Sequence, residues 1–542
     1  MTARLLALGL LVATAPPGRA ADIVVYGATA GGVAAAVQAS RSGKSVVLIE
    51  PGTHVGGLTS GGLGFTDSGN KAVVGGVARE FYRRLKAHYV KPEAWTLEKP
   101  EQCKTYRPAE DAVWSFEPKV AEATLRAMLA DAKVTVAFGE RLDRAAGKGL
   151  KLDGQRITAL ATESGKVYEG KVFIDATYEG DLMAAAGVTF TVGREPNAKY
   201  GETLNGVQRT LNKKNHRFLV NVDPFVKAGD KASGLLPGVE ADELPADGAG
   251  DRRVQAYCYR MCMTQNPANR VAFAKPAGYD ERLYELLLRN FEAGDLRVPF
   301  SPDRVPNAKT DTNNSGAVST DFIGGNAAYP GASYAERDAI KLAHLTYQQG
   351  LMWTLTSHAR VPRKVRDAVA KWGLAADEFT DTGHWPHQIY VREARRMVGD
   401  HVQTESDCRR SRQTPESVGM GSYNMDSHNC ARYVTPAGFV QNEGDVQESP
   451  GGPYRIAYRS IVPKRGECPN LLVPVCVSSS HIAYGSIRME PVFMVLGQSA
   501  ATAAVLAIDD KCDVQSVDPA KLRAKLLADK QVLEYAAPPK AK

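Results

Sequence analysis

Residues 22–50 read DIVVYGATAGGVAAAVQASRSGKSVVLIE, and this stretch decides the fold. An apolar run at 23–26 predicts a short buried strand, and a turn of glycine, alanine and threonine follows it. An alanine-rich segment then predicts a helix, and residues 46–49 predict a second strand. The order strand, turn, helix, strand is typical of one half of a dinucleotide-binding α/β fold.

The turn carries the residues that a nucleotide site needs. Gly27 allows a tight turn, while Gly31 and Gly32 let the backbone approach a phosphate at the start of the helix. Glu50 ends the second strand, where an acid binds the hydroxyls of the adenosine ribose. Thr29 takes the place of the second glycine, and its hydroxyl is a candidate donor to a phosphate. The alternative is an ordinary turn of small residues that binds no nucleotide.

Composition bounds the kind of protein. The chain has 542 residues, 44% of them apolar and 23% charged, which predicts a soluble globular protein of two intertwined domains. The net charge of +7 is scattered, so neither nucleic acid nor a membrane surface is an expected partner. Eight cysteines in so long a chain indicate no disulfide framework, and no Cys-x-x-Cys or Cys/His cluster indicates a metal site.

Residues 1–20 have the pattern of a secretory signal peptide. An apolar run at 5–13 is followed by Gly18 and Ala20, small residues at the positions that precede cleavage. We therefore expect a mature chain that begins at Ala21 and is exported to the periplasm or the medium. The alternative is an anchored N-terminal helix, which is disfavoured because the apolar run is too short to span a bilayer.

The rest of the chain is expected to form a nucleotide-binding domain with a second domain inserted in it. Residues 22–190 form the first part, 191–455 the inserted α+β substrate domain and 456–510 the returning part, while 511–542 form a C-terminal helix and tail. A small β-meander is predicted near 150–169. The other predicted helices are 78–89, 119–132, 281–292, 333–356 and 362–371.

The returning part is distinguished by its apolar character. Residues 471–477 are too apolar for an edge strand, so we expect them to complete a buried sheet. The long apolar segment 491–508 contains Gln498 and predicts a buried helix rather than a membrane span. Three turns of small residues, at 27–32, 175–180 and 478–485, each follow a predicted buried strand. Such a return to the nucleotide-binding domain is typical of flavoproteins.

The sequence resembles secreted bacterial FAD-dependent oxidoreductases with a glutathione-reductase-type Rossmann fold, over nearly the whole mature chain. The segments that carry the resemblance are the 27–32 turn, GGLTSGGLG at 56–64, FIDATYEGDL at 173–182, HQIYVREARR at 387–396, GSYNMDSH at 421–428 and the block 481–504. The resemblance implies an α/β fold with a parallel sheet and a β-meander, bound FAD and redox chemistry. It implies no particular substrate.

The resemblance also assigns residues to the cofactor. The turn and Glu50 would hold the pyrophosphate and the adenosine ribose, and the glycine-rich loop would line the ribityl chain and the isoalloxazine ring. The returning helix would direct its positive N-terminal end toward the flavin pyrimidine ring. The residues implied to bind FAD are Gly27, Thr29, Gly31, Gly32, Glu50, Gly56, Gly57, Thr59, Ser60, Thr177, Gly485, Arg488 and Glu490.

Hydride transfer to a flavin often needs a base that takes a hydroxyl or amine proton, and histidine suits neutral pH. His481, His428 and His387 lie in the distinctive segments. His481 follows the returning strand directly, and His428 lies near Asp426, which either orients it or is itself the base. We take His481, His428 and Asp426 as the catalytic candidates. The alternative for each histidine is a structural hydrogen-bonding role.

Two sets of residues are candidates to bind the substrate. The residues that would clamp a substrate carboxylate are Arg392, Arg395 and Arg396, and the alternative is an exposed helix face paired with Glu393. The residues that would build an aromatic, sugar-type pocket are Tyr257, Tyr259, Arg260 and Trp385, and the alternative is core packing. From these we take Arg392, Arg395 and Tyr259 as substrate-binding. His54 is interpreted as a surface-loop residue rather than a covalent flavin attachment.

The expected function is that of an FAD-dependent oxidoreductase. It would transfer a hydride between the flavin and a substrate that is a small polar metabolite or a sugar derivative, with an unidentified electron acceptor. One alternative is an NAD-dependent dehydrogenase, because the turn and Glu50 suit NAD equally well. The other is a non-catalytic ligand-binding protein that keeps the fold. The C-terminal return and the export signal favour FAD over NAD.

Overall fold

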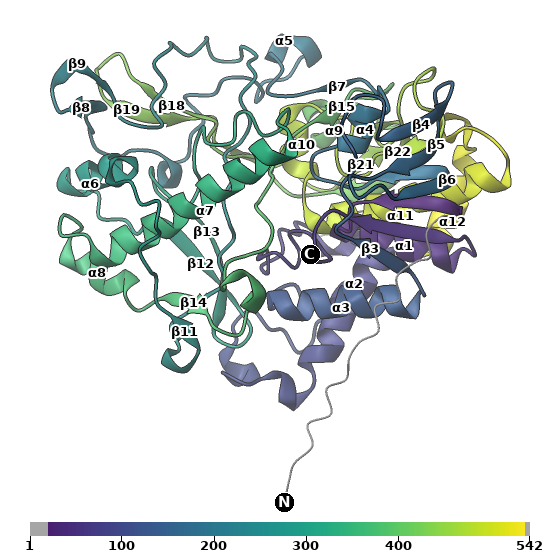
Figure 1. Ribbon diagram of the computed structural model, residues 1–542, viewed down its shortest axis with the longest axis horizontal. Coiled ribbons are helices and arrows are strands. Elements are labelled where there is room, and N and C mark those ends of the chain that lie inside the picture. The colour runs from purple at the N-terminus through teal and green to yellow at the C-terminus, as the bar shows by residue number, and fades with distance from the viewer. Residues whose placement is uncertain (1–19, 537–542) are drawn as a thin grey trace, which may run out of the picture.

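The computed structural model describes residues 20–536, so all but the last residue of the predicted signal peptide lies outside the described residues. The first strand begins at Ala21. Figure 1 shows a sheet-and-helix half that contains both the first and the last helices of the chain, and a second half crossed by one long helix.

A seven-stranded sheet builds the nucleotide-binding half. Its order is β3–β2–β1–β6–β5–β4, and β22 also pairs with β6. The parallel strands are β1 (Ala21–Tyr26), β2 (Val46–Glu50), β3 (Thr135–Phe138), β6 (Val167–Asp175) and β22 (Leu471–Leu472). The antiparallel strands are β4 (Leu150–Asp153) and β5 (Arg156–Ala161). The predicted α/β fold with a parallel sheet and a β-meander is confirmed.

The register brings three strand ends to one edge of the sheet. Tyr26 lies opposite both Ile49 and Asp175. The carboxyl ends of β1, β2 and β6 therefore lie side by side, and in open α/β sheets ligands bind outside such ends. The fold thus places the turn after β1, Glu50 at the end of β2 and the turn after β6 around one crevice.

Two predicted strands differ from the structure. The last meander strand and the strand expected near 172–177 are one continuous strand, β6, in which Gly170 stays extended and pairs with Ala21. Its first half pairs with β5 and its second half with β1. The predicted strand 471–477 does join this sheet, but only Leu471 and Leu472 form β22. The buried residues after it bond elsewhere, since the Val473 amide donates to the Ile461 carbonyl.

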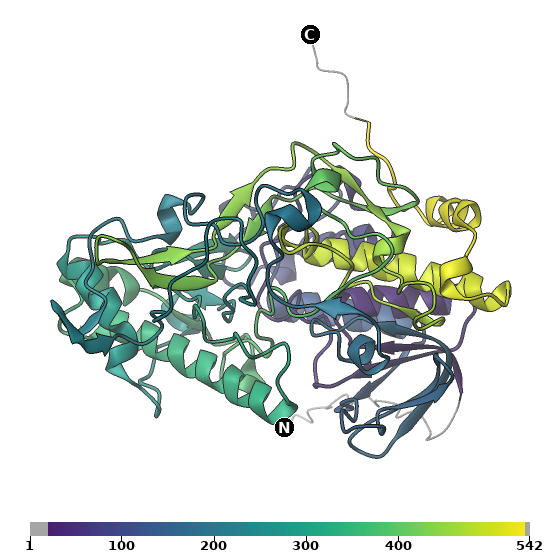
Figure 2. The ribbon, with the colours of Figure 1, turned by 90° about the horizontal axis from the view of Figure 1, so that it is seen from above.

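The first and last long helices of this half interlock. These helices are α1 (Ala30–Arg41) and α11 (Glu490–Asp509), which lie side by side in both Figure 1 and Figure 2. A Cβ on Gly497 would fall 2.0 Å from the Gly31 carbonyl oxygen, so only glycine permits this approach. Within residues 20–536, α11 alone is long and apolar enough to cross a membrane, and 89% of its apolar window is buried inside the protein. It is a core helix, as predicted.

Three further helices cover this half: α2 (Gly76–Tyr89), α3 (Pro118–Asp131) and α12 (Pro519–Ala528). Proline at the first turn of α3 and α12 costs no hydrogen bond, because the first amides of a helix have no intrahelical acceptor. The Asp518 side chain caps α12 by accepting from the Ala520 amide. The short helix α10 (His481–Ile487) precedes α11.

The second half contains a five-stranded antiparallel sheet of order β11–β14–β10–β13–β12. Its strands are β11 (Arg270–Val271), β14 (Gly373–Ala375), β10 (Met263–Thr264), β13 (Lys309–Asn314) and β12 (Phe300–Val305), and its helices include α6 (Glu285–Glu292), α7 (Tyr334–Ser357) and α8 (Arg363–Val369). A capping box between Ser333 and Glu336 starts α7. The division of the chain at residues 190, 455 and 510 stays a prediction.

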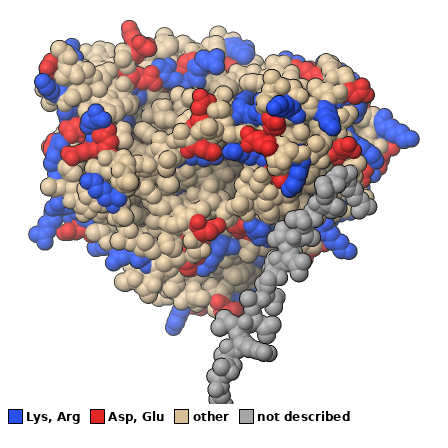
Figure 3. All heavy atoms as spheres, in the orientation of Figure 1, with Lys and Arg blue, Asp and Glu red and all other residues tan. Residues whose placement is uncertain are grey.

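The segment between this sheet and α10 forms antiparallel strand pairs nested one within the next, of which only the innermost, Ala431–Val434 with Val440–Glu443, is a short hairpin. The strands nearest the site are β16 (Ser417–Gly421), β17 (Met425–Ser427), β20 (Val446–Glu448) and β21 (Tyr454–Ala457). Charged side chains of both signs are intermixed over the face of the molecule shown in Figure 3.

Candidate functional site

The turn between β1 and α1 is as tight as the sequence predicts. Gly27 has a φ of +97°, in the region that favours glycine. A Cβ on Gly32 would lie 1.9 Å from the Gly27 carbonyl oxygen, which no side chain permits. The first amides of α1 have no intrahelical partner, so the start of this helix is ready to bind an anion.

Thr29 supports this turn instead of contacting a phosphate through its hydroxyl. Its Oγ1 donates to the Ala176 carbonyl at 2.8 Å and accepts from the Gly32 amide at 3.2 Å. The hydroxyl proton is therefore used between the turns that follow β1 and β6. The suggested hydrogen bond from the Thr29 hydroxyl to a phosphate is wrong for this conformation, because that hydroxyl already donates to the Ala176 carbonyl.

Glu50 stands where a ribose-binding acid is expected. Its Oε2 accepts from the Ala28 amide and its Oε1 from the Gly52 amide, both at 2.7 Å. Burial raises the pKa of this carboxyl to about 7, against the lowering effect of the two amides. Each carboxylate oxygen has a further lone pair, so hydroxyl donors of a ribose would stabilise the charged form.

The glycine-rich loop connects this turn to α11. Gly56 forms a bridge with Thr29, so the loop starts beside the turn. Glu490, the first residue of α11, accepts from the Thr59 hydroxyl at 2.8 Å and from the Tyr178 hydroxyl at 2.9 Å. Glu490 is 2% exposed, and burial raises the pKa of its carboxyl to about 7. Gly57 is required here, because a Cβ would lie 2.3 Å from the Tyr178 hydroxyl.

Three other predicted cofactor residues have structural partners. The Ser60 hydroxyl donates to the Val55 carbonyl at 2.6 Å, and the Thr177 hydroxyl donates to Asp175 at 2.7 Å. Gly485 lies inside α10 rather than in a turn, because the predicted turn 478–485 becomes helical from His481 onward. A Cβ on Gly485 would lie 2.7 Å from the Asp426 carbonyl, so this glycine lets α10 approach β17.

Beyond the glycine-rich loop, three guanidinium groups surround the ring of Tyr390. Arg488 donates to the Tyr390 hydroxyl at 2.6 Å, and the guanidinium carbons of Arg392 and Arg260 lie 4.2 and 5.8 Å from the ring centroid. All four side chains are buried. We call these residues, with the aspartates and His428 described below, the Tyr390 cluster.

Each arginine of the cluster is paired with an aspartate. Arg392 pairs with Asp321 at 2.8 Å, Arg488 with Asp426 at 3.1 Å and Arg260 with Asp311 at 2.7 Å. Two more carboxyls, Asp67 and Asp303, lie close enough to the arginines to interact electrostatically, and burial raises the pKa of each. Among the described residues, five carboxyls thus face three guanidinium groups.

The glycine-rich loop reaches this cluster at its far end. The carbonyl of Arg260 would lie 2.0 Å from a Cβ on Gly62, and the Phe65 amide donates to Asp311 at 3.1 Å. One continuous loop therefore runs from the nucleotide turn at Thr29 to the Tyr390 cluster. A ligand with a nucleotide end and a flat ring would extend along the same path.

His428 is the histidine of this cluster. Its Nδ1 lies 2.7 Å from Asp321 Oδ2, and its Nε2 lies 3.6 Å from Asp426 Oδ2. Burial favours neutral carboxyls, but Arg392 and His428 outweigh it and lower the pKa of Asp321, while His428 and Arg488 lower that of Asp426. Two of the three catalytic candidates, His428 and Asp426, are therefore brought together, and their neighbours favour the charged forms of Asp321 and Asp426.

His481 is differently placed. Its Nδ1 contacts both carboxylate oxygens of Glu393 at 2.9 Å, and its Nε2 lies 3.0 Å from the Ser427 hydroxyl. The residue is 2% exposed at the start of α10. Both ring nitrogens are thus occupied by protein groups, which is the structural role that the sequence left open for this histidine.

The arginines predicted to act together belong to separate networks. Arg392 is in the Tyr390 cluster, whereas Arg395 pairs with Asp181 at 2.8 Å. Arg396 pairs with Glu195 at 2.9 Å and Glu393 at 2.8 Å. All three are buried, so the exposed helix face is wrong. Tyr259 packs in the core, where its hydroxyl donates to the Lys341 carbonyl at 3.2 Å.

His54 lies in a loop, as the sequence predicts, but its side chain is only partly exposed and has several partners. Its ring stacks on His387 with centroids 3.9 Å apart and an interplanar angle of 7°. Its nitrogens lie 3.1 Å from Glu122 and 3.1 Å from Asp381. Because parallel stacked rings cannot both direct an in-plane lone pair at one ion, this pair does not form a metal site in the conformation seen. The hydrogen bond to Glu122 raises the pKa of His54.

Several residues of the cluster were missed in the sequence. Tyr390 lies within the segment HQIYVREARR, and Asp67 lies shortly after the glycine-rich loop. The motifs that carry the family resemblance therefore pointed to the neighbourhood of both residues. No sequence pattern points to Asp321, because it lies in an irregular segment more than 100 residues before His428. Only the folded chain brings these residues together.

FAD fits these residues. The tight turn and the free amides at the start of α1 suit a pyrophosphate, and Glu50 beside the Ala28 amide suits a ribose. The glycine-rich loop then leads along α11 to the Tyr390 cluster. This arrangement supplies both a nucleotide end and a polar site for chemistry.

The match to a family profile agrees with this fit. The profile of the family described as FAD dependent oxidoreductase matches residues 22–526. A search of curated proteins finds no match. Local similarities among solved structures include L-proline dehydrogenase from P. horikoshii (16% identity, 33% of this chain and 59% of that chain, TM-score 0.24) and THI4 from Thermovibrio ammonificans (20% identity, 32% and 66%, TM-score 0.21). Because the family match covers most of the chain, the protein belongs to the FAD-dependent oxidoreductases.

Proposed function

We propose that this FAD enzyme transfers a hydride between a small polar, sugar-derived substrate and the flavin, with His428 as the base. The observation that carries the proposal is the pairing of His428 Nδ1 with Asp321 at 2.7 Å inside the cluster that the glycine-rich loop reaches. Between the two candidate histidines, the geometry favours His428, because both nitrogens of His481 are occupied at hydrogen-bonding distance.

The chemistry follows from this geometry. Bound FAD supplies the acceptor for the two electrons that leave the substrate as a hydride. A substrate hydroxyl would give its proton to His428 Nε2, the nitrogen that Asp321 leaves available. Asp321 fixes the tautomer by accepting from Nδ1–H, and its charge stabilises the imidazolium that forms. Arg488 holds Asp426 beside that nitrogen, where it can accept from a second substrate hydroxyl.

The charges of the cluster support a neutral, hydroxyl-rich substrate. Each of the three guanidinium groups already pairs with an aspartate, so a substrate carboxylate would have to displace an aspartate or stay unpaired. Carboxylates are acceptors only, and hydroxyl groups are the donors that satisfy them. The carboxylate clamp considered for Arg392 is therefore disfavoured, since Asp321 already neutralises that side chain.

Anaerobic reduction of the holoenzyme tests this proposal. An aldose is expected to bleach the flavin absorbance, and the corresponding uronic acid is expected to do so at least about tenfold more slowly, which corresponds to roughly 1.4 kcal/mol, because its carboxylate finds no unpaired guanidinium group. The uronic acid serves as the matched control because it differs only at one carbon. Faster reduction by the uronic acid, or no reduction by any sugar of a broad panel, would exclude a neutral sugar-derived substrate.

We further propose that the protein is exported and that an acceptor outside the cytosol reoxidises it. The support is the signal-like pattern of residues 1–20, together with a first strand that begins at Ala21, directly after the predicted cleavage site. Expression with the full leader should yield an extracytoplasmic protein whose N-terminal sequence starts ADIVVY. Recovery of an intact Met1 in the cytosolic fraction alone would contradict export.

A further inference from the structure

A cavity of about 850 Å³ lies between α1, α2 and α12, away from the site described above. Gln38, Arg41 and Ser42, at the end of α1, line it, whereas the nucleotide turn lies at the start of that helix. Since α1 has 12 residues, the two places are separated by about 18 Å along the helix axis. No residue assigned above to FAD or substrate lines this cavity.

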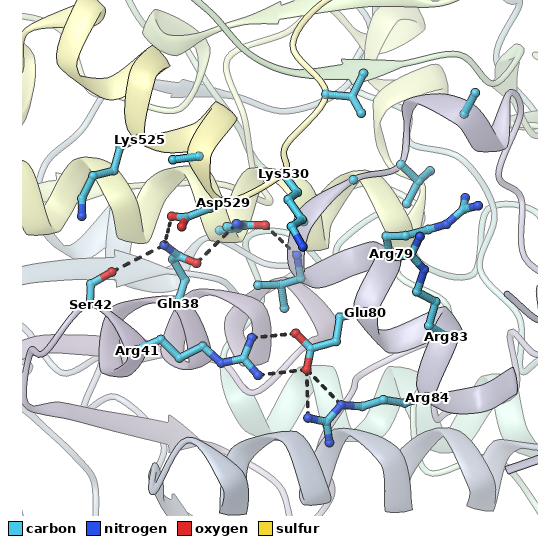
Figure 4. A pocket seen from close by; sticks show the side chains of 18 of the residues that line it. Gln38, Arg41, Ser42, Arg79, Glu80, Arg83, Arg84, Lys525, Asp529 and Lys530 are labelled. Atoms are coloured by element: carbon cyan, nitrogen blue, oxygen red, sulfur yellow. Dashed lines mark hydrogen bonds and ion pairs between the residues drawn. The ribbon is translucent and has the colours of Figure 1, made fainter. Parts of the chain in front are cut away.

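The lining of the cavity is dominated by cations. Six cationic side chains contribute to it: Arg41, Arg79, Arg83, Arg84, Lys525 and Lys530. Figure 4 shows Arg41 of α1 and Arg84 of α2 both pointing toward Glu80. The Glu80 carboxylate thus pairs with two guanidinium groups, that of Arg41 at 2.6 Å and that of Arg84 at 2.9 Å. Arg79 and Arg83 likewise share the single carboxylate of Asp111.

The two lysines add charge that the protein does not balance. Within residues 20–536, neither Lys525 nor Lys530 has a carboxylate partner, and Figure 4 shows Lys530 extending from the last loop toward the start of α2. The remaining acids are Asp131, which pairs with Arg84, and Asp529, which accepts from the Gln38 amide at 2.7 Å. Six cations therefore face four carboxylates, an excess of two positive charges.

The polar floor of the cavity is fixed in place. Gln498 Oε1 accepts from the Val77 amide at 2.8 Å, and the Gly76 amide donates to the Lys530 carbonyl at 2.9 Å. A Cβ on Gly76 would lie 2.0 Å from Gln498 Oε1, so only glycine lets the start of α2 approach this closely. The lysine-bearing loop is thereby anchored over a concave surface.

We infer that this cavity binds a small ligand with clustered anionic oxygens, a polyphosphate or polycarboxylate of about nucleotide size. The volume lies within the range of roughly 300–1,000 Å³ that small-molecule sites occupy. Guanidinium forks and ammonium groups are the donors that bind phosphate and carboxylate oxygens. A ligand with two or more negative charges would neutralise the two lysines and compete with the shared carboxylates for the arginines.

Calorimetric titration of the FAD-loaded enzyme at low salt tests the inference, with tripolyphosphate and citrate as separate probes. Loading with FAD keeps the pyrophosphate site from binding either probe. We expect saturable binding of at least one probe, and the two arms distinguish a phosphate from a carboxylate ligand. The Lys525→Gln/Lys530→Gln double variant should weaken that binding by about tenfold or more, because it removes both unbalanced charges.

The matched control is Lys364→Gln/Lys371→Gln, which removes one exposed lysine in α8 and a second that lies two residues after its end. It lowers the net charge equally and should leave binding within about twofold. Three results would overturn the inference: no binding of either probe, equal weakening in both double variants, or binding of polyglutamate without binding of the small probes. The last result would indicate an acidic protein partner instead. Unchanged flavin absorbance confirms that each variant is folded.

Discussion

Replacing Gly32 by alanine is expected to give a protein that purifies without FAD. The added methyl group would lie 1.9 Å from the Gly27 carbonyl oxygen and 3.1 Å from the Ala176 side chain. The turn cannot keep its shape around that atom, so the free amides of α1 are displaced from the pyrophosphate. We expect binding at least about a hundredfold weaker, or roughly 2.7 kcal/mol. The flavin-to-protein absorbance ratio and fluorescence titration with FAD measure this.

Gly331→Ala is the control for this substitution, because a Cβ on Gly331 would meet no atom within 4 Å. It should retain the full complement of cofactor. Thermal unfolding of FAD-stripped wild-type protein provides the reference for the fold of the Gly32 variant. If Gly32→Ala binds FAD like the wild type, the pyrophosphate does not lie at this turn.

The second large effect is expected at His428. His428→Ala should keep FAD but reduce the rate of anaerobic flavin reduction by about a hundredfold or more, because the substrate proton loses its acceptor. Asp321→Asn should also slow reduction while leaving the imidazole in place, since an amide can no longer fix the tautomer as a charged acceptor. Stopped-flow absorbance with the best reducing sugar provides the measurement.

His481→Ala separates this assignment from its rival. The imidazole of His481 links Glu393 to Ser427 inside the core, so its loss should lower the melting temperature more than the rate of reduction. A hundredfold slower reduction in the His481 variant with a normal rate in the His428 variant would reverse the assignment. If both variants reduce the flavin at the wild-type rate, then either Asp426 is the base or the reaction needs no protein base.

The nucleotide-binding half could be predicted because its signals are local. The turn 27–32, Glu50 and the helices at 76–89 and 118–131 depend on neighbours within about 30 residues. Glycine positions and 3.6-residue periodicity report such local constraints directly. Even the return of Leu471 to the sheet followed from its apolar surroundings, although the strand is shorter than expected.

The chemistry of the Tyr390 cluster could not be predicted in the same way. Asp321, Tyr390 and His428 come from irregular segments that carry no periodic pattern. Ion pairing between distant residues leaves no trace in a single sequence, so Arg392 and Arg395 looked like members of one clamp but bind different aspartates. His54 likewise looked exposed because its partner His387 lies more than 300 residues away.

The close contact between Gly31 and Gly497 determines when, during synthesis, the cofactor site can form. The nucleotide turn leaves the ribosome early, but the helix that packs against it emerges about 460 residues later. At 5–20 residues per second, that interval lasts roughly 25 to 90 seconds. For that time the small-residue face of α1 has no native partner. Stable capture of the cofactor is therefore expected only after α11 has emerged and packed against α1.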